Sequence, residues 1–168
     1  VVAVLIFFMG PRASLFVAIS IPLSMLMSFI LIEAFGMTLN MIVLFSLILA
    51  LGMLVDNAIV IVENVYRHVE EGQDVVTASI EGTREVAMAV AASTATTVAA
   101  FFPLVFWTGV MGQFMGYLPK TVIIVLISSL VVAVAILPVL TSKLLKQKDA
   151  VQLAKSRARG ESKVMRLY

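Results

Sequence analysis

The chain of 168 residues is 61% hydrophobic, has a mean hydropathy of +1.09 and holds only 13% charged residues. Soluble domains are about half apolar and about a quarter charged. This composition excludes an ordinary soluble domain and indicates a membrane protein. We therefore expect the lipid bilayer as a partner, and we expect no nucleic acid.

The chain contains several apolar stretches of the length that a membrane span requires, about 20 residues. In chain order, the predicted spans are 13–34, 40–63, 86–107 and 120–142. The opening stretch, 1–9, is too short to cross alone and has no initiator Met or basic leader. We expect it to be the end of a truncated span that begins outside this chain. The sequence thus predicts an all-α fold, a polytopic membrane helix bundle of about five spans over 1–145.

The segments between the spans are short or polar. Residues 36–40 form a predicted turn, and residues 64–85 a polar connector. Within this connector, Asp74 is a candidate N-cap for a short amphipathic helix over 75–82, and we expect His68 to be solvated. The tail 146–168 is basic with interspersed apolar residues. It is read as an amphipathic segment on the cytoplasmic membrane surface, with a solvated tail as the alternative.

Basic residues fall almost entirely on one side of the predicted bundle. Eleven of the 12 lie in segments that the alternating spans place together: Arg12, Arg67, Arg84, Lys143, Lys146, Lys148, Lys155, Arg157, Arg159, Lys163 and Arg166. Only Lys120 lies on the other side. Since Lys and Arg mark the cytoplasmic side, residues 35–40 and 108–119 are predicted to face outward.

The span 40–63 carries a carboxylate, Asp56, in its interior. Asp56 precedes Arg67 by eleven residues, roughly 16 Å along a helix, which places it near the middle of the hydrocarbon core. A charge there costs about 3 kcal/mol even by low estimates. The carboxylate must therefore be protonated, or be paired or hydrated in a protein-lined cavity. A group balanced between these states can carry a proton, and its cationic partner must come from outside these spans.

Three neighbours of this aspartate are candidate site residues. Gly52 lies one turn earlier on the same face and would let another helix approach closely. Asn57 can hydrogen-bond in a proton relay but cannot titrate, and a helix-packing hydrogen bond is the alternative. Glu63, on the same face near the cytoplasmic interface, is read as part of a proton exit path or as a polar helix end.

The span 86–107 contains a polar strip of hydroxyl side chains: Ser93, Thr94, Thr96 and Thr97. Thr96 and Thr97 are candidates for a hydrated lining beside the relay. The alternative is that these hydroxyls bond the backbone of their own helix or bridge to another helix.

No metal-ligand spacing, nucleophile arrangement or phosphate-binding loop appears in the sequence. We expect no enzyme activity, no cofactor and no metal site. An intramembrane aspartyl protease would need two facing aspartates that share a proton. The chain has one intramembrane aspartate and no GxGD motif.

Several motifs in register resemble the resistance-nodulation-division (RND) transporters, in their acriflavine-resistance branch. The motifs are "GPRASLFVAISIPLS", "FGMTLN", "LGMLVDNAIVIVENVYRHVEEG", "ASIEGTREVAMAVAASTATTVAAFFPLVFWTGVMGQFMGYLPKTV" and "LPVLTSKLL". The resemblance implies transmembrane helices two (partial) to six of a twelve-helix protein. That is the N-terminal half of the RND transmembrane domain, in the bacterial inner membrane.

The resemblance also implies a function. The family's proton relay uses acidic residues of its fourth helix, which correspond here to Asp56 and Asn57. Many relatives have two aspartates at these positions. The relay's lysine partner lies in the remaining half of the transporter. The expected function is proton-driven export by antiport, in a homotrimer with a periplasmic adaptor and an outer-membrane channel. Alternatives are RND-type export of metal ions, lipids or protein segments, or a non-transporting membrane scaffold or sensor.

Overall fold

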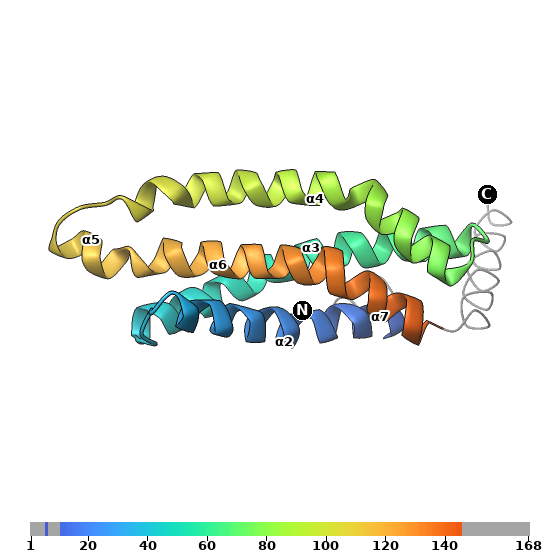
Figure 1. Ribbon diagram of the computed structural model, residues 1–168, viewed down its shortest axis with the longest axis horizontal. Helices are drawn as coiled ribbons and strands as arrows, with labels where there is room; N and C mark the ends of the chain where they lie inside the picture. The colour runs from blue at the N-terminus through green and yellow to red at the C-terminus, as the bar shows by residue number, and fades with distance from the viewer. Residues whose placement is uncertain (1–5, 7–10, 146–168) are drawn as a thin grey trace, which may run out of the picture.

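The computed structural model describes residue 6 and residues 11–145, and it forms a bundle of long helices (Figure 1). The helices are α2 (Pro11–Ala34), α3 (Met41–Glu70), α4 (Val75–Val105), α5 (Val110–Met115), α6 (Tyr117–Val131), the π-helix η1 (Val132–Ile136) and α7 (Leu137–Leu144). The described part contains no strand, which confirms the all-α prediction. The tail 146–168 lies outside the described residues, as does all of 1–9 except Ile6, so both remain predictions.

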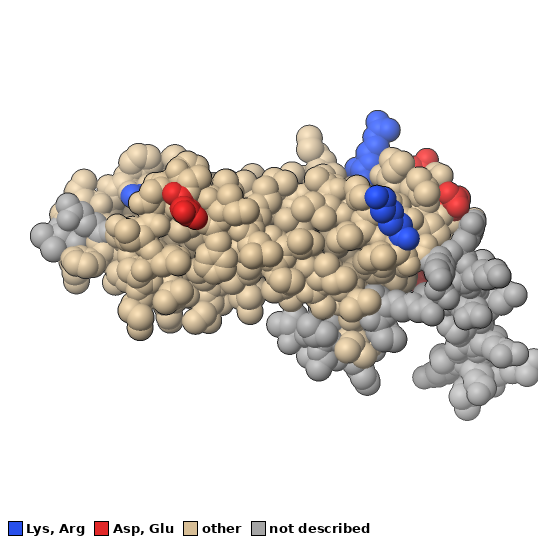
Figure 2. Space-filling view, turned by 60° about the horizontal axis from the view of Figure 1, so that its bottom comes forward, with Lys and Arg blue, Asp and Glu red and all other residues tan. Residues whose placement is uncertain are grey.

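Four helices are long and apolar enough to cross a membrane: Ala13–Ala34, Met41–Glu70, Val75–Val105 and the continuous helix Tyr117–Leu144. Successive helices run in opposite directions along one axis (Figure 1). On the face that Figure 2 shows, charged side chains lie near the two ends and the middle is uncharged. A lipid bilayer favours this arrangement, because a helix satisfies its own backbone groups and only its ends reach water.

Helix α3 is central and packs against α2, α4 and α6. Two apolar clusters meet on it. One cluster includes Leu54 and earlier residues of α3, and the other includes Val55 and later ones. Both residues are almost fully buried. The core of the bundle is thus divided at the level of the predicted relay residues.

The predicted polar connector 64–85 is mostly helical. Helix α3 continues to Glu70 and α4 begins at Val75, so only residues 71–74 connect them. Asp74 does cap α4, accepting a hydrogen bond from the Val76 backbone N–H at 3.3 Å. The helix that it caps continues to Val105 and is not a separate element over 75–82. The cause is tertiary packing: one face of the first turns of α4 is buried, and it continues the packing against α3 beyond the predicted spans.

The turn between α2 and α3 follows from two residues. Gly36 has a φ of +67°, a left-handed conformation that glycine adopts without steric cost. The backbone N–H groups of Gly36 and Met37 donate to the carbonyls of Glu33 (2.8 Å) and Ile32 (3.0 Å), which ends α2. Asn40 then accepts from the Val43 backbone N–H at 2.9 Å and starts α3. These contacts explain why the chain reverses direction between α2 and α3 within a few residues.

The bundle allows a direct test of the predicted orientation. Cysteines at Thr38 and Thr108, both exposed in connections that are predicted to face outward, are expected to react with an impermeant thiol reagent in whole cells. A cysteine at Thr77, exposed on the first turn of α4, is the matched internal position. A cysteine at the nearby Ser79 would be a poorer internal position for labelling. The Ser79 side chain is buried, and its hydroxyl is hydrogen-bonded to the Thr141 hydroxyl at 3.1 Å. Labelling at Thr77 and protection at the other two positions would contradict the predicted orientation.

Candidate functional site on helix α3

Asp56 lies about halfway along α3, and its side chain is exposed. Within the described part of the chain it has no hydrogen-bond or ion-pair partner. The carboxylate therefore faces away from α2, α4 and α6, the helices that bury the rest of α3. In a bilayer this face cannot remain against lipid while the carboxylate is charged, because hydrocarbon does not solvate it.

Gly52 and Glu63 share the exposed face of α3 with the aspartate. No described atom lies within 4 Å of the position that a Cβ at Gly52 would occupy. Glu63 is also exposed, and α3 continues for two more turns beyond it, so it does not end the helix. Large apolar side chains complete the face: Phe45 is 59% exposed and Ile48 is 72% exposed. The described helices thus leave one apolar stripe of α3 uncovered, with a carboxylate at its centre.

Asn57 points the other way, into the bundle, and is 8% exposed. The Thr94 hydroxyl on α4 donates to Asn57 Oδ1 at 3.2 Å, and Asn57 Nδ2 donates to Ser129 Oγ on α6 at a longer 3.4 Å. The Ser129 hydroxyl in turn donates to the Leu54 carbonyl of α3 at 2.7 Å. The structure therefore separates Asp56 from Asn57, and it joins Asn57 to two hydroxyls on neighbouring helices.

The other candidate hydroxyls do not reach this junction. Thr96 donates to the Ala92 carbonyl at 2.9 Å, and Thr97 donates to the Ser93 carbonyl at 3.1 Å, both within α4. Thr94, in the same polar strip, is the member that contacts α3. Ser129 had no distinguishing signal in the sequence, because it lies in an apolar helix and its partners are far away along the chain.

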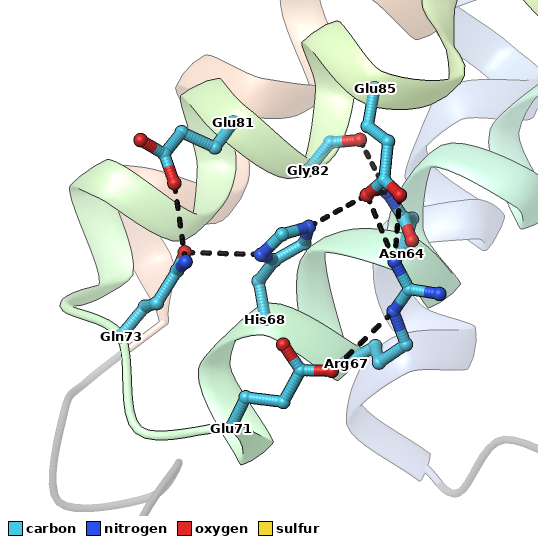
Figure 3. A network of polar contacts seen from close by, with 8 residues as sticks. All are labelled: Asn64, Arg67, His68, Glu71, Gln73, Glu81, Gly82 and Glu85. Carbon is cyan, nitrogen blue, oxygen red and sulfur yellow. Dashed lines mark hydrogen bonds and ion pairs between the residues drawn. The ribbon is translucent and has the colours of Figure 1, made fainter.

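A second polar cluster ties α3 to α4 at the end where the two helices connect (Figure 3). Glu85 of α4 accepts hydrogen bonds from Asn64 Nδ2 (2.9 Å), His68 Nε2 (2.8 Å) and Arg67 Nη2 (2.9 and 3.1 Å) of α3. Asn64 Nδ2 also donates to the Gly82 carbonyl at 2.7 Å. The expectation that His68 is solvated is wrong, because Glu85 on one side and Gln73 on the other hold its ring.

Glu85 lies in the first part of α4, before the predicted span 86–107, and its side chain is about half exposed. The hydrogen bonds from Asn64, His68 and Arg67 lower the pKa of Glu85 from 4.5 to about 2. A lowered pKa contributes stability that is fully present above the ordinary value and is lost only as the pH falls toward the lowered one. Glu85 is thus charged at neutral pH, and its hydrogen bonds join α4 to the end of α3.

Sequence comparison matches residues 1–166 to the AcrB/AcrD/AcrF family. The chain belongs to this family. The match confirms the resemblance to the acriflavine-resistance branch of the RND transporters, and with the four span-length helices it identifies a multi-pass protein of the bacterial inner membrane.

Relatives of this chain include proteins named "Multidrug resistance protein MdtC". The one from Pantoea ananatis is 34% identical over 87% of this chain and 14% of its own length. Those from Salmonella heidelberg and Yersinia pseudotuberculosis are 34% and 33% identical, over 92% and 98% of this chain and 15% and 16% of their own lengths. The chain thus spans about a seventh of the length of the relatives that it matches.

Proposed function

We propose that this chain is the proton-coupling half of the transmembrane part of an RND exporter, and that Asp56 takes up and releases the proton. One observation carries the proposal. Asp56 is the only charged residue that lies away from the ends of the four predicted spans, and it is exposed on a face that no described helix covers. A lysine from the remaining half of the transporter would face it there.

Protonation of Asp56 would switch α3 between two pairings. The charged carboxylate attracts the lysine of the other half, whereas the neutral acid releases it. Since α3 packs on α2, α4 and α6 and is bonded to α4 through Glu85, a shift of α3 would move these helices together. Such rigid-body motion between two halves is how repeat-built transporters alternate their access. Coupled to export, it makes the protein a proton antiporter.

The names of the relatives support multiple drugs as the exported substrates, and export of metal ions, lipids or protein segments is the alternative. The resemblance further supports a homotrimer that works with a periplasmic adaptor and an outer-membrane channel. In this proposal the substrate is handled outside residues 1–168, and the chain supplies the driving force.

Proton flux through the full-length transporter tests this function. In proteoliposomes that contain a trapped pH indicator, transport of the fluorescent cation ethidium should be accompanied by an opposite proton flux. A membrane scaffold or sensor would give neither flux. Ethidium movement that ignores an imposed pH gradient would contradict proton coupling.

A substitution at Gly52 tests whether another helix covers the exposed face of α3. No described atom lies within 4 Å of a Cβ at this position, so we expect Gly52→Leu to leave the packing of this half unchanged. In the full-length transporter we expect lost export with normal membrane insertion, because small residues allow close helix approach in lipid. The measurement is ethidium efflux at matched expression, and Ile48→Leu, at an exposed apolar position of the same face, is the control. Normal efflux in Gly52→Leu would mean that no helix approaches there.

A further inference from the structure

We infer that Asn57 is a positioning residue, an amide that ties α3 to α4 and α6, and that its surroundings select an amide over a carboxylate. The inference rests on the proposed role of Asp56 and deepens it. Its consequence is that α3 carries one proton site and not two, although many relatives have two aspartates here.

The direction of the hydrogen bonds around Asn57 carries the inference. A serine hydroxyl has one hydrogen, and Ser129 uses it for the Leu54 carbonyl at 2.7 Å. The Ser129 oxygen can then only accept, and it faces Asn57 Nδ2 at 3.4 Å. On the other side Thr94 donates to Asn57 Oδ1 at 3.2 Å. The site needs a donor toward α6 and an acceptor toward α4, and an amide supplies both.

A carboxylate at this position would not match its neighbours. One oxygen could accept from Thr94, but the other would face the Ser129 oxygen, whose hydrogen is already committed. Either Ser129 gives up its bond to α3, or the acid stays protonated and donates to Ser129. An unpaired charge in this buried position is costly.

Charged residues do not offer an alternative partner. In α2, α4, α6 and α7 they lie toward the helix ends: Arg12, Glu33, Glu81, Arg84, Glu85, Lys120 and Lys143. The partners that α4 and α6 present to Asn57 are hydroxyls. A second acid at position 57 would therefore have no described cation to stabilise its charged form.

The same contacts orient the aspartate. Successive residues of a helix project about 100° apart, so a side chain held between α4 and α6 at position 57 turns Asp56 toward the uncovered face. Leu54, Val55 and Ala58 are buried around the junction and oppose rotation as well. The hydrogen bonds fix the rotation of α3 more strictly than the apolar contacts do, because they depend on distance and angle and break if α3 rotates.

Two variants of the full-length transporter test the inference, each with a readout beyond activity. Infrared spectroscopy of Asn57→Asp should show an added protonated carboxyl that persists through neutral pH. Ethidium efflux in proteoliposomes should keep the one-proton pH dependence of the wild type. Ser129→Ala should lower efflux several-fold and shift the midpoint of its pH profile, because Asp56 is no longer held in one direction.

Ser128→Ala is the matched control, since Ser128 is equally buried but donates at 2.8 Å to Ile124 of its own helix. Its rate and pH midpoint should equal those of the wild type. The inference is overturned if Asn57→Asp titrates near neutral pH with a two-proton dependence, or if Ser129→Ala behaves as Ser128→Ala does. Gradient-driven efflux that survives Asp56→Asn would instead refute the proposed function, and the infrared result for Asn57→Asp does not depend on transport.

Discussion

A full-length transporter with Asp56→Asn is expected to insert and fold normally and to lose gradient-driven export. Asparagine keeps the shape of the side chain and its ability to hydrogen-bond, but it is permanently neutral. Residue 56 then has no charged state, so the proposed switch between a charged and a neutral side chain cannot operate. Packing should not suffer, because Asp56 contacts no hydrogen-bond partner in the described part of the chain.

Ethidium efflux from energised vesicles, at matched expression, measures the effect. We expect efflux in Asp56→Asn at the level of vesicles without transporter. Glu63→Gln makes the same chemical change on the same exposed face of α3, two turns closer to the end of the helix, and should retain most of the activity. Substantial gradient-driven efflux in Asp56→Asn would show that the carboxylate is structural.

Gly82→Leu is expected to destabilise the bundle strongly, by separating α4 from α3. A Cβ at Gly82 would lie 3.0 Å from Val65 Cα and 3.1 Å from Val65 N, both backbone atoms that cannot turn aside. The Gly82 carbonyl also accepts the 2.7 Å hydrogen bond from Asn64, which would be lost if the helices moved apart. Overpacking of this kind costs typically 1–3 kcal/mol, and the loss of the Glu85 contacts would add to it.

The thermal midpoint of the purified full-length protein measures this effect. We expect Gly82→Leu to have the lowest midpoint, because leucine adds further atoms beyond a Cβ that already lies 3.0 Å from Val65 Cα. Ala92→Leu enlarges an exposed position of the same helix and should change the midpoint little. A Gly82→Leu protein as stable as the Ala92→Leu control would mean that α3 and α4 do not approach as closely as the structure indicates.

The surface of α3 shows where sequence reasoning about helix faces reaches its limit. Gly52, Asp56 and Glu63 were predicted to share a face, and the helical period does place them together on one exposed stripe. The period cannot say which stripe of a mostly apolar helix meets its neighbours within the chain. The described helices cover the opposite side of α3, where Asn57 lies, so adjacent residues of one motif have different surroundings.

The sequence by itself determined the all-α class and the family, and it predicted the spans and the single intramembrane carboxylate. Each follows from a local property, since a bilayer demands long uncharged helices and makes one acid among apolar residues conspicuous. The tertiary structure decided the rest. Asn57 finds Thr94 and Ser129 at sequence separations of 37 and 72 residues, and Glu85 holds His68 from the next helix. Such partners depend on how helices rotate and pack against one another, and that arrangement is set by many weak contacts acting together.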